Sequence, residues 1–139
     1  MTPAHRTRFV GWSSIAVGIA VGLVIGLWSF DGPLATPAWI GEYTDTSRRL
    51  LRLGHIAFIG LGLLSILLAD ELGRSSLGAR GRQMASRLMV AGNVGLPLLL
   101  IGAAIWRPLK FAMGVPATCV FAAMVLAAWG ARKQLTTNN

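Results

Sequence analysis

The chain has 139 residues, of which 54% are hydrophobic and only 13% are charged, and its mean hydropathy is +0.61. Because a soluble domain carries about 25% charged residues, this composition excludes a soluble domain, a disordered chain and a disulfide scaffold, and it is typical of an integral membrane protein. The net charge of +8 would suit nucleic acid, but here the basic residues flank apolar segments, where lipid headgroups lie. We therefore expect membrane lipids as partners, and no nucleic acid.

Four apolar segments are long enough to span a bilayer. About 20 helical residues, at 1.5 Å each, cross roughly 30 Å of hydrocarbon. The segments with about this length are Phe9–Phe30, Leu50–Ala69, Leu88–Trp106 and Phe111–Gly130. Outside them no single stretch reaches the roughly 40 residues that even a marginal soluble domain needs. The sequence therefore predicts one transmembrane domain over residues 1–139, an all-α bundle of four helices.

Lysine and arginine are more numerous on one side of this topology than on the other. Eight lie in the N-terminal tail, the middle loop and the C-terminal tail: Arg6, Arg8, Arg74, Arg80, Arg82, Arg87, Arg132 and Lys133. Five lie on the other side: Arg48, Arg49, Arg52, Arg107 and Lys110. Because cytoplasmic loops carry the excess, we expect both termini in the cytoplasm, with the chain in the plasma (inner) membrane. The first apolar segment is longer than the 7–15 residues of a signal-peptide core, so we interpret it as a retained span.

Glycines recur on one face of the first span. Gly18, Gly22 and Gly26 are spaced by four residues, and Gly11 lies seven residues before Gly18. Small residues at this spacing let another helix backbone approach closely. The pattern predicts a helix-packing face, a glycine zipper, whose partner is either another span of this chain or another subunit.

The ends of the second and third spans carry local signals. Residues 45–47 (Asp-Thr-Ser) are N-cap types and Gly73 is a C-cap type. Arg48 and Arg49 are expected to reach the lipid headgroups. The short connection Arg107–Lys110 makes the third and fourth spans antiparallel neighbours.

His55 is the candidate for cofactor binding. It lies about 12 Å along the second helix from Ser47, below the outer headgroups, and polar groups at such depth are costly and functional by default. Imidazole is a common metal ligand, and Met113 is the one intrachain candidate for a second axial haem ligand, since His5 lies on the opposite side. The alternatives are a proton or quinone-type site, and an interface histidine bonded to a carbonyl or acid of a neighbouring helix.

A few other polar residues fall within the apolar segments. They are Arg52, Ser65, Asn93, Thr118 and Cys119. Arg52 can extend its charged head to the interface, and Cys119 is interpreted as a small packing residue. Pro97 clashes with the carbonyl of Asn93, four residues earlier, so a kink is expected in the third span.

Depth separates His55 from Asn93. Each lies five residues from the start of its span, but the two spans start on opposite sides of the membrane. This puts the two residues roughly 14 Å apart along the membrane normal for spans of about 30 Å. Ser65 lies near the depth of Asn93, so a Ser65–Asn93 hydrogen bond is expected if the second and third spans are neighbours.

These features predict a non-catalytic structural or accessory subunit of a larger protein complex in the membrane. The sequence has no paired carboxylates, no Gly-rich phosphate loop and no CxxC motif, so we expect no enzyme activity of its own. One alternative is an electron-transfer subunit that binds haem through His55 with a partner chain. Another is a small transporter that uses a cavity near Asn93. A visible spectrum of the purified protein tests the first alternative, and flux in liposomes tests the second.

Overall fold

The computed structural model describes residues 1–29, 32–42 and 45–137, with side chains up to residue 133. All regular structure in these residues is helical. The elements are α1 (Pro3–Gly26), α2 (Thr46–Arg74), α3 (Ala79–Ile105), the short 3-10 helix η1 (Arg107–Ala112) and α4 (Gly114–Thr137). Four helical segments, the fourth formed by η1 together with α4, are long and apolar enough to cross a membrane. The prediction of an all-helical chain with four helices of this kind is confirmed.

Each of the four long helices extends past its predicted apolar segment at the end that holds the N-terminus, and α4 does so by continuing to Thr137. α1 begins six residues before Phe9, and α3 begins nine residues before Leu88. α2 continues to Arg74, so Gly73 lies inside the helix and its prediction as a C-cap is wrong. The predicted end of the first span, Phe30, lies outside the described residues. The extensions are rich in polar residues, which suits the headgroup region of a bilayer.

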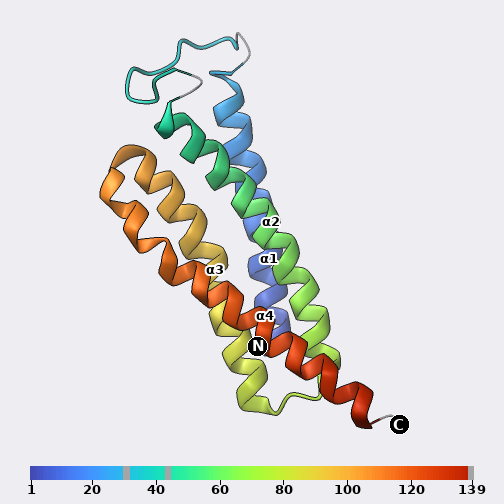
Figure 1. The fold of residues 1–139 in the computed structure, drawn as a ribbon. Helices are drawn as coiled ribbons and strands as arrows, with labels where there is room; N and C mark the ends of the chain where they lie inside the picture. The colour runs from blue at the N-terminus through green and yellow to red at the C-terminus, as the bar shows by residue number, and fades with distance from the viewer. Residues whose placement is uncertain (30–31, 43–44, 138–139) are drawn as a thin grey trace.

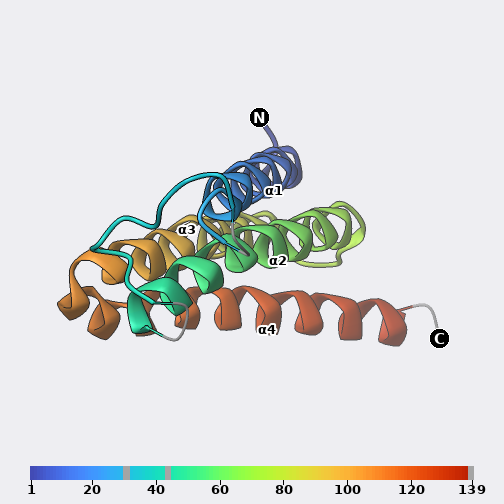
Figure 2. The same ribbon diagram turned by 90° about the horizontal axis from the view of Figure 1, so that it is seen from above.

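The helices form three layers (Figure 1). Figure 2 shows α1 in one outer layer, α2 and α3 in the middle layer, and α4 in the other outer layer. Within the described residues α1 and α4 make no contact with each other. Successive helices run in opposite directions, so the N-terminus, the α2–α3 connection and the end of α4 share one end of the molecule. η1 makes the turn that folds α4 back onto α3, as the short connection predicted.

The buried face of α1 consists mainly of small residues: Thr7, Gly11, Ser14, Gly18 and Ile25. A β-carbon on Gly11 would lie 2.8 Å from the carbonyl oxygen of Gly62, and one on Gly18 would lie 3.0 Å from that of His55. The backbones of α1 and α2 are therefore in close contact, and the glycine face packs against a helix of the same chain. Gly26 is not part of this contact, because no described atom lies within 4 Å of its β-carbon position.

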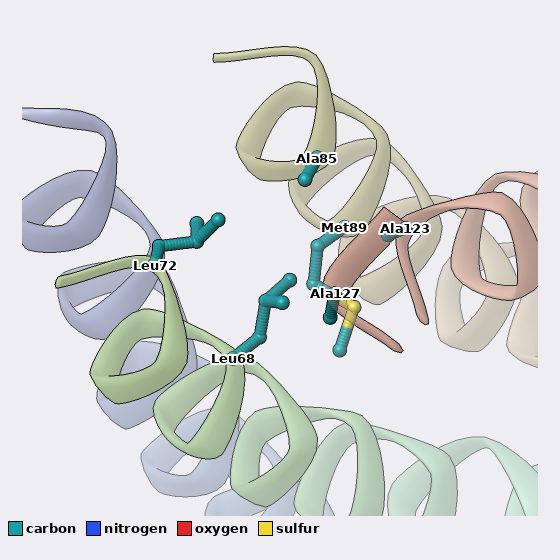
Figure 3. Close-up of a cluster of buried hydrophobic side chains, with 6 residues drawn as sticks. All are labelled: Leu68, Leu72, Ala85, Met89, Ala123 and Ala127. Carbon is teal, nitrogen blue, oxygen red and sulfur yellow. The ribbon is translucent and has the colours of Figure 1, made fainter. Parts of the chain in front are cut away.

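The largest apolar core lies where α2, α3 and α4 meet (Figure 3). Its buried members are Leu68 and Leu72 from α2, Ala85 and Met89 from α3, and Ala123 and Ala127 from α4. Because α4 contributes only alanines, it lies close against α3. A β-carbon on Gly92 would lie 2.8 Å from the carbonyl oxygen of Pro116, which shows that the two backbones nearly touch.

The α1–α2 loop is anchored at the opposite end of the bundle. Ile40 is 2% exposed and packs with Ile25, Leu51 and Ala104. Asp45 precedes α2 as the N-cap position predicts, but its side chain makes no cap hydrogen bond to the helix. Its Oδ2 instead accepts a hydrogen bond from the backbone N–H of Glu42 (2.8 Å). Gly41 has a φ of +73°, which favours glycine at this turn.

Candidate functional site

Three buried polar side chains form a network between α1, α2 and α3. Ser14 Oγ donates to Asn93 Oδ1 (2.7 Å), and Asn93 Nδ2 donates to Ser65 Oγ (2.9 Å). Ser14 Oγ also lies 3.0 Å from the carbonyl oxygen of Phe58, so its single proton is shared between two acceptors. Asn93 and Ser65 are 0% exposed and Ser14 is 5% exposed. The network therefore joins three helices inside the protein, where an unsatisfied polar group would be costly.

The Ser65–Asn93 hydrogen bond is the one expected from the depths of these residues. Asn93 contacts Ser14 on α1, whereas the ring of His55 lies against Gly22. Ser14 and Gly22 are eight residues apart, which is about 12 Å along a helix. His55 and Asn93 therefore occupy different levels of the bundle, close to the separation that the sequence predicts. The described structure has no hydrogen bond between His55 and Asn93.

A second polar layer lies nearer the N-terminus. Thr7 Oγ1 and Ser86 Oγ are 2.7 Å apart, and they lie 2.9 Å and 3.1 Å from the carbonyl oxygen of Pro3. Both hydroxyl side chains are buried. This layer ties the first turns of α1 to α3, so α1 is held to its neighbours by polar contacts at two heights.

His55 lies in the contact between α1 and α2. A β-carbon on Gly22 would lie 3.2 Å from Cδ2 and 3.7 Å from Nε2 of the imidazole. The Cδ2–Nε2 edge of the ring therefore rests on the α1 backbone. Nδ1 is buried and has no hydrogen-bond partner among the described residues. His55 is thus an interface histidine, but its Nδ1 lacks the bond to a carbonyl or acid that this alternative expected.

Met113 is the second axial ligand that the sequence suggested for a haem at His55. Met113 follows η1, which packs on α3 and α4 but, within the described chain, not on α1 or α2. The structure therefore does not bring Met113 to His55. In the part of the chain that is described, no three His, Cys, Asp or Glu side chains are grouped so as to hold a metal ion.

Arg48 has a position that the sequence did not predict. It is only 8% exposed, and its Nη2 donates to the carbonyl oxygen of Trp28 (2.6 Å) and lies 3.5 Å from Ser29 Oγ. These groups follow the last residue of α1, where the negative end of the helix dipole favours a cation. The prediction that Arg48 reaches the headgroups is therefore wrong, since the end of α1 offers a closer partner. Arg49 is exposed, and Arg52 is half-buried.

Sequence analysis missed three members of these polar layers. Ser14 and Thr7 share the face of Gly11 and Gly18, at helical spacings of three and four, so the stripe of small residues was a usable signal. Ser86 had no such signal. Its partner Thr7 lies 79 residues away in the sequence, and the contact appears only when α1 and α3 are placed together.

Together these features define an all-helical protein in which four helices have the length and composition of membrane spans and three of them share a buried polar network. Comparisons of the chain with protein-family models, with curated proteins and with solved structures gave no match. The function is therefore inferred from the contacts and surfaces of the chain itself.

Proposed function

We propose that this chain is a multi-pass membrane protein that serves as a non-catalytic structural subunit of a larger membrane complex. The observation that carries the proposal is the outer face of α4. One side of α4 packs on the α2–α3 pair through Pro116, Ala123 and Ala127. The other side is apolar and exposed along most of its length, with Phe121 at 69% and Trp129 at 62% exposed.

The composition of this outer face suits another transmembrane helix. Ala117 and Ala128 are exposed on it, and small residues let a second backbone approach closely within a bilayer. Thr118 is a polar residue on the same face, and its Oγ1 donates to the carbonyl oxygen of Gly114 (2.7 Å). Its hydroxyl therefore needs no further partner, and burying this face against a second helix leaves no unsatisfied donor there.

The buried polar network also supports a structural role. Transport pathways use polar side chains that face a water-filled cavity. In this chain Ser14, Ser65 and Asn93 direct their polar atoms at one another and at the backbone. Their arrangement holds α1, α2 and α3 together.

Tryptophan substitutions on α4 test the subunit proposal. Ala117→Trp and Ala128→Trp should release the chain from a larger assembly in mild detergent, because the added indole separates the two helix surfaces. The measurement is the mass of the solubilised particle by size-exclusion chromatography with light scattering. Leu67→Trp is the matched control, since Leu67 is a 64% exposed apolar residue of α2.

The control should stay in the assembly, and all three variants should still be found in the membrane fraction. If the unchanged chain runs as a single copy, or if the α4 variants assemble as well as the Leu67 variant, then lipid covers this face and the proposal fails.

We also propose that both termini lie in the cytoplasm, as the excess of basic residues indicates. The count of basic residues places the N-terminal tail, the α2–α3 connection and the C-terminal tail on one side of the membrane. The structure supports this grouping. Ser76 Oγ, in the α2–α3 connection, donates to the carbonyl oxygen of Gly130 near the end of α4 (2.9 Å). The N-terminus lies at the same end of the molecule (Figure 1).

Cysteine labelling in intact cells tests this orientation. In a Cys119→Ala background, Thr36→Cys should react with an impermeant thiol reagent, whereas Gly78→Cys should react only after lysis. Both sites are exposed, and a β-carbon at Gly78 would meet no described atom within 4 Å. Labelling at position 78 without labelling at position 36 would reverse the orientation.

A further inference from the structure

A pocket of about 760 Å³ lies at the end of the molecule that holds the N-terminus. Three helix ends form it: the first turns of α1, the last turns of α2 and the first turns of α3. Apart from Ala69, the last residue of the second apolar segment, the lining residues lie outside the apolar segments. Its volume falls within the range of about 300–1,000 Å³ that is usual for small-molecule sites.

The rim of this pocket is cationic. Arg8, Arg74 and Arg82 line it, together with a single acidic residue, Asp70, which leaves two net positive charges. Arg8 Nη2 forms an ion pair with Asp70, and the two side chains are 46% and 49% exposed. Such an exposed pair adds little stability, but it holds the guanidinium of Arg8 beside the pocket.

The pocket also has an apolar floor. Ala69 and Leu72 of α2 line it and are themselves buried, and Ala4 of α1 adds a further methyl group. A cationic rim above an apolar floor, at the height of the headgroups, matches a molecule with a negative phosphate next to hydrocarbon. Basic pockets between transmembrane helices recognise anionic lipid headgroups in this way.

We propose that this pocket binds the phosphate-bearing headgroup of an anionic phospholipid. The inference rests on the proposed insertion of the chain into a membrane. Arg82 lines the pocket from α3, and a guanidinium can donate two parallel hydrogen bonds to phosphate oxygens. The apolar floor takes the first carbons of the lipid, which a free phosphate ion does not have.

Lipid titration of the full-length protein tests the proposal. The chain is placed in nanodiscs of phosphatidylcholine alone, or of an equimolar mixture of phosphatidylcholine and phosphatidylglycerol. Phosphatidylglycerol should raise the melting temperature and stay bound in native mass spectrometry. Inorganic phosphate added to the phosphatidylcholine nanodiscs should do neither.

Substitutions locate the binding within the pocket. Arg82→Gln should weaken phosphatidylglycerol binding about tenfold, because a charge-assisted hydrogen bond is lost. Arg80→Gln is the matched control: Arg80 lies two residues away in the same helix turn, is exposed and does not line the pocket. It should change the affinity by less than about twofold, as expected for the loss of a screened surface charge.

Asp70→Asn should act in the opposite direction. The substitution removes the one negative charge of the rim and releases Arg8 from its ion pair. Binding of phosphatidylglycerol should therefore become tighter. Arg82→Lys should retain part of the affinity, since it keeps the charge but loses the paired donors.

Four results would overturn the proposal. Equal losses for Arg80→Gln and Arg82→Gln would mean a diffuse surface attraction. Equal binding of inorganic phosphate and phosphatidylglycerol would assign the pocket to a soluble phosphate compound. Stable incorporation into phosphatidylcholine without any preference for phosphatidylglycerol would reject the lipid site alone, whereas failure to enter any bilayer would reject the membrane proposal as well.

Discussion

Replacing Gly18 by alanine is expected to lower the free energy of unfolding by about 1–3 kcal/mol, the usual cost of extra volume in a packed core. The new β-carbon would lie 2.7 Å from Ile59 Cγ1 and 3.0 Å from both the carbonyl oxygen of His55 and Phe58 Cβ. Because one of these neighbours is backbone, side-chain rotation cannot relieve the overlap, and α1 must move away from α2. Reversible denaturant unfolding in mixed micelles measures the loss.

Two other glycines of the same face provide graded controls. Gly26→Ala should leave stability unchanged or raise it slightly, since its β-carbon meets no described atom within 4 Å and alanine favours a helix. The stability of the Gly22→Ala variant should lie between those of Gly18→Ala and Gly26→Ala. The nearest neighbour of its β-carbon is the ring of His55, at 3.2 Å, and this ring can turn. The close packing of α1 on α2 is contradicted if Gly18→Ala is as stable as Gly26→Ala.

Replacing Asn93 by alanine is expected to lower the free energy of unfolding by about 1–3 kcal/mol. Two interhelical hydrogen bonds are lost, and such bonds contribute about 0.6 kcal/mol on average and up to about 1.7 kcal/mol in membrane proteins. The deleted amide also leaves a small cavity in the contact of three helices. The same unfolding measurement applies, and the variant should remain in the membrane fraction.

A double-mutant cycle separates the hydrogen bond from the cavity. Asn93→Ala and Ser65→Ala should be coupled by about 0.5–2 kcal/mol, as expected for residues in direct contact. Ser13→Ala is the control, because Ser13 is exposed on α1, and its effect should add to that of Asn93→Ala without coupling. Additive effects of Asn93→Ala and Ser65→Ala would contradict the bond. A stable, assembled Asn93→Ala variant whose complex has lost its activity would instead place Asn93 in a functional cavity.

Several features of this protein follow from its sequence alone. The four helices are visible because hydropathy and length are properties of single continuous segments. The Ser65–Asn93 hydrogen bond could be predicted because the constant rise of a helix converts residue number into depth, provided that both helices cross the same apolar layer. The glycine face of α1 is visible because its spacing lies within one helix.

Other features were decided only by the tertiary structure. The sequence left open whether the glycine face packs against this chain or another. In the structure Gly11 and Gly18 pack against α2 of the same chain, whereas Gly26 makes no such contact. The burial of Arg48 and the basic pocket at the N-terminal end depend on which helix ends lie together. The rotation of each helix about its axis and the choice of its neighbours are determined by contacts between residues far apart in the sequence. The periodicity within one helix shows which residues share a face, but not what that face meets.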